Sequence, residues 1–235
     1  MATLPELGRA VVACRACPRL VAHRERVAHE KRRQYLDCAY WGKPLPGFGD
    51  PQARVLLVGL APAAHGGNRT GRLFTGDRSG DWLFAALHAA GFANQPESTD
   101  RRDGLRLTDA YITAAVRCAP PDNKPSRVEL ERCRAYLARE LQLLPRVQVV
   151  VALGRIAMDG YLAARAAAGQ SVPRPRPSFG HGATHQLGEL TLVTSYHPSQ
   201  QNTLTGRLTR AMLAEVFVTV RRLLQRARDQ TGRGP

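Results

Sequence analysis

The sequence predicts an α/β fold, a three-layer α/β/α sandwich in which helices cover both faces of a central four-stranded parallel sheet. Four short runs are rich in Val, Ile, Leu and Thr and end at Gly, Pro or polar residues, as buried strands do. The runs lie far enough apart for helical crossovers, and amphipathic segments fit between them. The predicted strands are residues 54–60, 110–116, 147–153 and 190–196.

A predicted helix follows each strand. The helices are Trp82–Ala90, Arg127–Leu144, Ile156–Ala168 and Arg207–Arg226. The Gly- and Pro-rich segment 43–51 is predicted to be a loop that leads into the first strand. Segment 169–182, which contains PRPRP, is predicted to be a basic surface excursion.

The chain has 235 residues, of which 43% are apolar, and this is enough for one sizeable core. One domain over residues 1–235 is predicted. The N-terminal sequence has no basic start followed by an apolar stretch, and no segment offers about 18 apolar residues in a row. We therefore expect a cytoplasmic protein with no membrane segment. We also expect it to be a monomer.

Basic residues strongly outnumber acidic ones. Lys and Arg total 34 against 19 Asp and Glu, which gives a formal net charge of +15. Nearly all the cations are Arg, but exchange of Lys for Arg leaves the charge unchanged, so compositional drift does not explain the excess. A polyanion is the expected partner, with DNA or RNA first and an anionic membrane surface or an acidic protein as alternatives.

Four of the five cysteines form a pattern typical of a metal centre. Cys14 and Cys17 form a C-x-x-C pair, Cys118 and Cys133 follow later, and Cys38 is left over. Neither a secreted disulfide framework nor a thioredoxin-like redox pair fits the context. The number of ligands does not separate zinc from an iron–sulfur cluster. Alternatively, Cys118 and Cys133 are ordinary core residues.

The loops after the predicted strands carry the polar and glycine-rich segments. In an open α/β sheet, ligands bind at the carboxyl ends of the strands. Segment 59–81 is glycine-rich, so its backbone can pass close to a ligand. It matches neither a P-loop nor a dinucleotide fingerprint.

Single residues in these loops are candidates for chemistry. Phe74 and Asp77 follow the first strand, where an aromatic face and a carboxylate can approach one pocket. Alternatively, Asp77 or Ser79 caps the next helix and Phe74 belongs to the core. His197 stands directly after the fourth strand and begins a rigid His-Pro-Ser turn, followed by small polar residues able to hold a nucleic-acid backbone.

These loops resemble one known family. GLAPAAHGGNRTGRLFTGDRSGDWL, VRCAPPDNKP and SYHPSQQNTLTGR are similar to signature segments of family 5, or type B, uracil-DNA glycosylases. The resemblance extends from CRACPRL through PGFGDP and VVALGRIA to the C-terminal helix. It implies hydrolysis of the bond between a deaminated base and deoxyribose. It also implies a [4Fe–4S] cluster on Cys14, Cys17, Cys118 and Cys133, away from the chemistry.

The resemblance implies roles for individual residues. Related families place a water-directing carboxylate or amide early in the first loop, where this chain has apolar residues, so Asp77 is expected to position the water. His197 is expected to hydrogen-bond the base carbonyl and stabilise the leaving anion. Phe74 is expected to stack on the flipped base, and Asn123 to contact it or to hold the flipped nucleotide.

Two larger groups complete the predicted site. Residues expected to bind the base are Gly59, Ala61, Pro62, Ala63, Phe74 and Ala114. Residues expected to contact DNA are His65, Asn68, Arg69, Arg72, Lys124, Ser199, Asn202 and Arg207. Families that read uracil strictly end the second strand with Asn, whereas this chain has Thr113-Ala114-Ala115. Tolerance of hypoxanthine and xanthine in double-stranded DNA is therefore expected.

Two other functions fit part of the pattern. A non-catalytic iron–sulfur regulator that binds nucleic acid would explain the charge and the cysteines, but not the Asp, His, Asn and Phe residues at strand ends. A metal-dependent nuclease usually needs several carboxylates in one site, and these loops offer few. The favoured prediction is a monofunctional DNA glycosylase of base-excision repair that leaves an abasic site.

Overall fold

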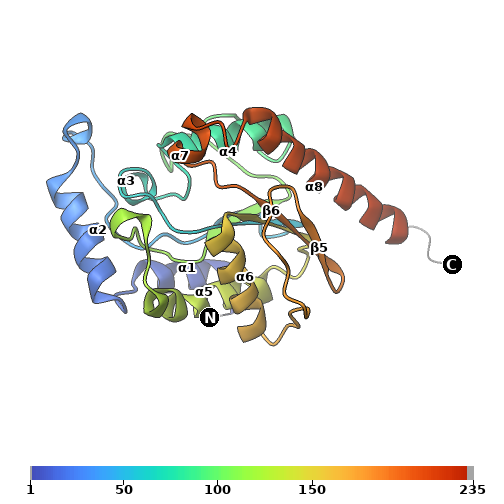
Figure 1. The fold of residues 1–235 in the computed structure, drawn as a ribbon. Helices are drawn as coiled ribbons and strands as arrows, with labels where there is room; N and C mark the ends of the chain where they lie inside the picture. Colours follow the sequence, from blue (N-terminus) through green and yellow to red (C-terminus); the bar gives the residue numbers. More distant parts are fainter. Residues whose placement is uncertain (1, 232–235) are drawn as a thin grey trace.

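A computed structural model, which describes residues 2–231, contains one six-stranded sheet between two layers of helices (Figure 1). The spatial order is β1-β3-β2-β4-β6-β5. The four central strands are parallel, and the two outer strands are antiparallel to their neighbours. The strands are β1 Phe48–Gly49, β2 Val55–Gly59, β3 Ala110–Ala114, β4 Val149–Leu153, β5 Thr184–Leu187 and β6 Leu190–Ser195. Met1 and residues 232–235 of the predicted domain lie outside the described residues.

The predicted α/β fold and its four parallel strands are confirmed, but the sheet is larger than predicted. Strand β1 lies in the segment expected to be an entry loop. Strand β5 lies at the other edge of the sheet, and only Leu187 of its four residues is buried. Neither strand has the continuous apolar run that marks the central strands, because each is exposed along one edge.

Helices cover both faces of the sheet. Helices α4 (Arg78–Ala89) and α8 (Arg210–Thr231) pack on one face, and α5 (Arg127–Leu143) and α6 (Arg155–Ala167) on the other. These four helices were predicted, with slightly different bounds. The sequence did not predict the two N-terminal helices, α1 (Leu4–Val12) and α2 (Pro18–Glu30). Helix α1 packs against α5. The short helical turns are η1 Arg33–Tyr35, α3 Gly67–Thr70, η2 Pro121–Asn123 and α7 Gln200–Leu204.

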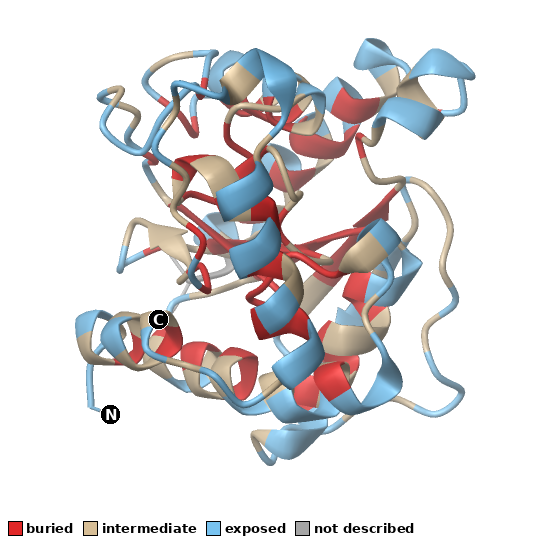
Figure 2. Cartoon of the chain, turned by 90° about the vertical axis from the view of Figure 1, so that its left-hand side faces the viewer, coloured by how far each residue is buried: buried red, intermediate tan, exposed pale blue. Residues whose placement is uncertain are grey.

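Alternate residues of each central strand enter two different cores. In β2, Val55 and Leu57 pack with α4 and α8, whereas Leu56 and Val58 pack with α5 and α6. Every residue of this strand is buried, which explains its uninterrupted apolar sequence. Figure 2 shows this buried sheet between helices whose outer faces are exposed. No helix within residues 2–231 is both long and apolar enough to cross a bilayer.

A buried ion pair joins α5 to the sheet. Arg117, just after β3, and Glu140 of α5 have side chains that are 1% and 2% exposed. Arg117 Nη1 donates to Glu140 Oε1 at 3.0 Å, and the Thr113 hydroxyl of β3 donates to Oε2 of the same carboxylate. Because each charge is removed from water, either one alone would be strongly unfavourable.

We expect Glu140→Leu to lower the free energy of unfolding by about 3–5 kcal/mol, because Arg117 would remain buried without its counterion. The measurement is urea denaturation followed by circular dichroism. The control is Glu131→Leu on the same helix, whose carboxylate pairs with an Arg127 side chain that is 92% exposed. Exposed pairs of this kind contribute about 0.5 kcal/mol, so equal losses in the two variants would contradict the role given to the buried pair.

Candidate active site

Polar and glycine-rich loops leave the sheet at one edge. The parallel strands end nearly in register, since Gly59 of β2 pairs with Ala114 of β3 and Leu153 of β4 pairs with Ser195 of β6. The predicted catalytic residues lie in the loops that follow β2, β3 and β6. Of the residues predicted to bind the base, Gly59, Pro62 and Ala114 are buried, and Ala61 and Ala63 are partly exposed.

Phe74 and His197, far apart in sequence, meet at this edge. Their rings are stacked with centroids 5.7 Å apart and planes 29° apart. The Phe74 ring also covers the end of β2, because a Cβ atom on Gly59 would come within 2.8 Å of it. Phe74 is only 8% exposed and belongs to the core that includes α4 and α8. The alternative of a core residue is therefore correct, and the same ring borders the candidate site.

The backbone and the charge state of His197 are both constrained. Asn202 Nδ2 donates to the carbonyl oxygen of His197 at 2.8 Å, and the Asn202 N–H is in turn capped by the Ser199 hydroxyl at the start of α7. Burial lowers the pKa of His197 to about 4. The imidazole is therefore neutral near pH 7 and offers one N–H donor.

Asp77 is the N-cap of helix α4. Its Oδ1 accepts a hydrogen bond from the Gly80 N–H at 3.0 Å, so the capping alternative is also correct. Its Oδ2 lies directly against Gly66, where an added Cβ would come within 1.9 Å. Burial raises the pKa of Asp77. The carboxyl group is thus held in one position by its own helix and by the first loop.

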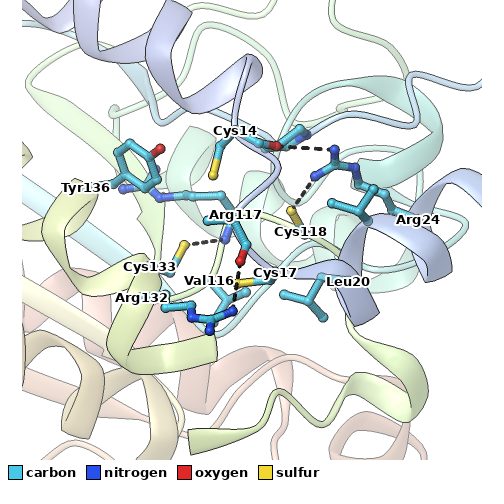
Figure 3. A pocket seen from close by; sticks show the side chains of 13 residues that line it. Cys14, Cys17, Leu20, Arg24, Val116, Arg117, Cys118, Arg132, Cys133 and Tyr136 are labelled. Atoms are coloured by element: carbon cyan, nitrogen blue, oxygen red, sulfur yellow. Dashed lines mark hydrogen bonds between the residues drawn. The ribbon is translucent and has the colours of Figure 1, made fainter. Parts of the chain in front are cut away.

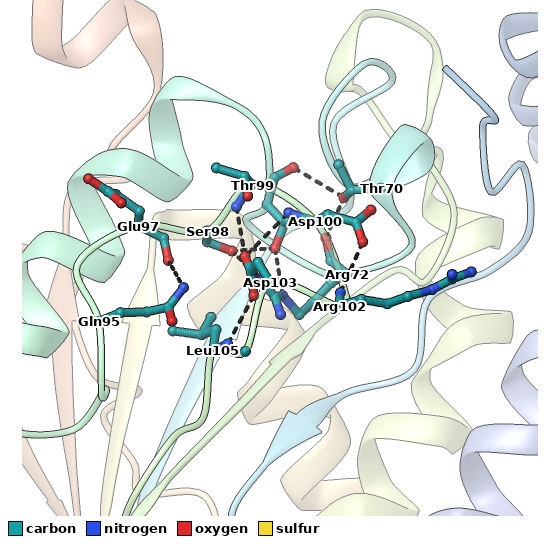
Figure 4. Close-up of polar contacts among 12 residues, drawn as sticks. Thr70, Arg72, Gln95, Glu97, Ser98, Thr99, Asp100, Arg102, Asp103 and Leu105 are labelled. Carbon is teal, nitrogen blue, oxygen red and sulfur yellow. Dashed lines mark hydrogen bonds and ion pairs between the residues drawn. The ribbon is translucent and has the colours of Figure 1, made fainter. Parts of the chain in front are cut away.

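A polar network fixes the loop between Phe74 and Asp77 (Figure 4). The backbone of Phe74 is left-handed, with φ of 53°, which is unfavourable for an aromatic residue. On either side, the hydroxyl of Thr75 donates to the Leu73 carbonyl at 3.1 Å, and the Gly76 N–H donates to the Ser98 carbonyl at 2.8 Å. These bonds hold the strained residue in the conformation that brings its ring to His197.

Arg72 is part of this network and not of the surface. Its guanidinium donates to the Asp103 carboxylate at 2.6 Å, to the Ser98 hydroxyl at 2.7 Å and to the Thr75 hydroxyl at 3.0 Å. The side chain is 8% exposed. The expectation that Arg72 contacts a phosphate does not agree with this burial, because all its charge is directed inward.

Asn68 likewise faces the interior. It is fully buried in α3, and its Nδ2 donates to the carbonyl oxygen of Arg24 on α2 at 3.1 Å. This bond ties the first site loop to the N-terminal helix pair. Its predicted DNA contact is therefore incompatible with the observed conformation.

The remaining residues predicted to contact DNA are at least partly exposed. Lys124 and Arg207 are exposed, and the Arg207 guanidinium lies over the Tyr196 ring at 4.6 Å from its centroid. His65 Nδ1 pairs with the Tyr40 hydroxyl at 3.0 Å. Ser199 and Asn202 are partly exposed at the start of α7, as is Arg69 in α3. Asn123, predicted to be catalytic, is exposed on η2, in the loop that follows β3.

The four predicted cysteine ligands line one small cavity, shown in Figure 3. Cys14 follows α1, Cys17 begins α2, Cys118 follows β3 and Cys133 lies on α5. Arg24 donates to the Cys118 sulfur at 2.9 Å, and the Arg117 N–H donates to the Cys133 sulfur at 3.3 Å. Cys38 lines a different pocket.

The four cysteines share a cavity but do not form a site for a single metal ion as they stand. Within residues 2–231, no group of three or more His, Cys, Asp or Glu side chains is arranged to hold one metal ion. A zinc site would require each sulfur at about 2.3 Å from a common centre. The arrangement of the described cysteines does not meet this requirement.

Several supporting residues escaped the sequence interpretation. Gly66 leaves room for the Asp77 carboxylate, and the Gly66-Gly67 pair was the available signal. Asp103 and Ser98 hold the loop around Phe74, but they lie in a polar segment with no local feature that distinguishes them. Arg24 joins the cysteine cavity to α3, and its only signal was a charged position among apolar ones in α2.

Comparison with known proteins gives a family for this arrangement. Residues 46–221 match the family described as the uracil DNA glycosylase superfamily. The type-5 uracil-DNA glycosylase of Thermus thermophilus is 54% identical over 214 residues, which cover 91% of this chain and 94% of that protein. The chain belongs to the type-5 uracil-DNA glycosylases.

Other members of the superfamily agree with this placement. The type-5 enzyme of Mycobacterium leprae is 52% identical over 223 residues, 94% of this chain and 96% of that protein. The type-4 uracil-DNA glycosylase of Archaeoglobus fulgidus is 30% identical over 158 residues, 67% of this chain and 62% of that protein. The type-5 family is therefore similar to this chain over nearly its whole length.

We expect Asp103→Asn to destabilise the protein by about 2 kcal/mol at pH 7. Burial raises the pKa of Asp103, but hydrogen bonds from Arg72 and from three backbone N–H groups outweigh that effect and lower it to about 2. A lowered pKa stabilises the fold above the unfolded value of 3.8, and this contribution is lost as pH falls toward 2.

Urea denaturation of both proteins between pH 7 and pH 3 measures this effect. The difference between the wild type and Asp103→Asn should shrink as the pH falls below about 4. Asp100→Asn, an exposed change in the same loop, serves as the control and should cost little. A difference between wild type and Asp103→Asn that does not depend on pH would contradict the assignment.

Proposed function

We propose that the protein hydrolyses the N-glycosidic bond between uracil and deoxyribose in DNA, leaving an abasic site and a free base. The observation that carries the proposal is the stacked contact of Phe74 with His197 beside the loop that positions Asp77. An aromatic face, a hydrogen-bond donor and a carboxylate are the groups that this reaction requires. The type-5 relatives named above are uracil-DNA glycosylases, which supports the same activity.

Cleavage of the bond develops positive charge on the sugar and negative charge on the base. The raised pKa of Asp77 makes its carboxylate a better acceptor for a proton of the attacking water. When ionised, the same carboxylate stabilises the positive sugar. His197 is neutral because its pKa is low, and its N–H donates to the oxygen of the departing base without giving up the proton.

The base must leave the duplex before it reaches these groups, so we propose that the enzyme flips the nucleotide. The Phe74 ring supplies a stacking surface for the flipped base. Strand β3 ends at Ala114, which has no side-chain group to pair with one particular base edge. We therefore propose that hypoxanthine and xanthine are also excised.

The exposed residues of the same edge would hold the DNA. Lys124 and Arg207 carry positive charge there, and Asn123 lies next to Lys124. The chain has only three lysines, and Lys124 is the one on the loops that carry the predicted site. A lysine that forms a Schiff base is usually activated by removal from water, whereas Lys124 is exposed. We therefore propose simple hydrolysis and not cleavage of the strand through a Schiff base.

We also propose that the four cysteines of the cavity bind a [4Fe–4S] cluster. In such a cluster each thiolate bonds a different iron, so the sulfurs surround the cluster and do not converge on one atom. The donor set fits, since four sulfurs from four segments line the cavity and two of them accept hydrogen bonds from Arg24 and Arg117. The cluster would supply a cross-link between the N-terminal helices, β3 and α5.

We expect Asp77→Asn and His197→Ala each to slow base release by about a hundredfold or more. Asn retains the capping acceptor, so Asp77→Asn removes the charge and keeps helix α4 intact. The measurement is single-turnover cleavage of duplexes that carry one uracil, hypoxanthine or xanthine, with abasic sites revealed by alkali.

Exposed residues away from the site loops provide the controls for this assay. Asp229→Asn on α8 and His88→Ala on α4 remove the same chemical groups at exposed positions and should leave the rate nearly unchanged. Near-full activity of both site variants would refute the catalytic roles. Wild-type protein that binds DNA but yields no abasic product would favour the non-catalytic regulator instead.

We expect Cys118→Ser to lose most of its bound iron, whereas Cys38→Ser retains a full complement. Cys118 lines the proposed cluster cavity, and Cys38 does not. Iron and acid-labile sulfide are assayed on protein purified without oxygen, together with its visible absorption. Equal iron contents in the two variants, or zinc in place of iron, would contradict the proposed cluster.

A further inference from the structure

A second pocket, of about 590 Å³, lies beside the first site loop. Its walls are segment 38–43, which follows η1, and segment 100–102, and Arg69 and Thr70 of α3 complete it. We call it the basic pocket. None of the catalytic roles proposed above uses it.

The basic pocket carries excess positive charge. Lys43, Arg69, Arg101 and Arg102 line it together with a single carboxylate, that of Asp100. Within residues 2–231, none of these four cations forms an ion pair with a carboxylate. The Asp100 carboxylate accepts the Arg102 N–H at 3.0 Å, so it is engaged in its own turn. The pocket thus offers unneutralised cations from three segments to an anion.

An indole ring organises two of these cations. The Arg101 guanidinium lies 4.5 Å from the centroid of the Trp41 ring, and Lys43 Nζ lies 5.7 Å from it. The ring itself is held in place, because its Nε1 donates to the Pro44 carbonyl at 3.2 Å. Cation–π contacts therefore keep both charges near one another before any ligand binds.

The third cation connects the basic pocket to the catalytic loop. The Arg69 guanidinium donates to the carbonyl oxygens of His65 and Gly76, both at 2.8 Å, and its face lies over the Tyr35 ring at 4.0 Å. Gly76 directly precedes Asp77. A ligand held in the pocket is consequently held against the same loop that positions the catalytic carboxylate.

The opposite wall is also fixed to that loop. Asp103 binds Arg72, and two N–H groups of its own segment donate to the same carboxylate oxygen of Asp103. Figure 4 shows the Arg102 side chain extending away from this network. The cations of segment 100–102 therefore project from a turn whose backbone is anchored.

We propose that the basic pocket binds a backbone phosphodiester of the DNA, near the nucleotide to be excised. Guanidinium groups match the two free oxygens of a phosphate in a bidentate manner, and the Trp41 ring holds the Arg101 and Lys43 charges in place for such a ligand. The inference rests on the proposed function, because it assigns the pocket to the DNA that the active site engages.

The test uses Lys43→Gln/Arg101→Gln, which removes the two cations at Trp41 and touches no catalytic residue. Binding is measured on a uracil duplex made resistant to cleavage by a 2′-fluorine on the target nucleotide. We expect Kd to rise about tenfold and the slope of log K against log salt to fall by about 1 for each lost phosphate contact. The single-turnover rate at saturating protein should stay within about twofold of the wild type.

The matched control is Arg146→Gln/Arg226→Gln, which changes the net charge by the same amount. Arg146 precedes the start of β4, whereas the site loops follow the strand ends, and Arg226 lies near the end of α8; both are exposed. If the pocket variant and the control have the same affinity and the same salt slope, the pocket does not bind DNA and the inference is overturned.

A scan of the duplex locates the contact. Each phosphate in turn is replaced by a neutral methylphosphonate. At the phosphate bound by the basic pocket, the replacement should weaken wild-type binding but have no further effect in Lys43→Gln/Arg101→Gln. Additive losses at every position would overturn the inference. Because these measurements do not require cleavage, wild-type protein that forms no abasic product would refute the proposed function while a pocket-specific binding loss would still support the phosphate site.

Discussion

The in-register carboxyl ends of the parallel strands are the constraint on which the candidate site depends. Gly59 faces Ala114 across the β2–β3 ladder, and Leu153 faces Ser195 across the β4–β6 ladder. Loops that are distant in sequence must therefore leave the sheet at one edge, where their polar groups meet. The contact of Phe74 with a histidine from the last strand follows directly from this register.

Register brings the loops together, but buried polar contacts determine their conformation. The Arg72–Asp103 pair lies between the loop of Phe74 and segment 98–103, and the hydrogen bonds of that segment hold a left-handed aromatic residue. Such strain persists only where the surroundings over-determine it. The Arg117–Glu140 pair joins α5 to the segment after β3, so both sides of the site edge rest on largely buried ion pairs.

The cysteine cavity and the site loops are joined through one arginine. Arg24 donates to the Cys118 sulfur and to the Cys14 carbonyl, and its own carbonyl accepts the Asn68 side chain. Asn68 belongs to α3, the same turn that carries Arg69 toward the basic pocket. Order at the N-terminal helices therefore extends through a continuous chain of contacts to the loop of Asp77. This path gives the cysteines a structural connection to the site loops.

The sequence by itself determined the α/β class and the four central strands, because runs of apolar residues are local patterns. Loop motifs are local as well, and they indicated the family and the edge of the sheet where the candidate site lies. It missed β1 and β5, whose exposed edges leave no apolar run. Tertiary structure alone decided the direction of each loop side chain. Asn68 and Arg72 resemble surface donors in sequence but point inward. Their partners, a carbonyl on α2 and the carboxylate of Asp103, lie in segments that no local pattern connects to them, and burial favours whichever conformation pairs those groups.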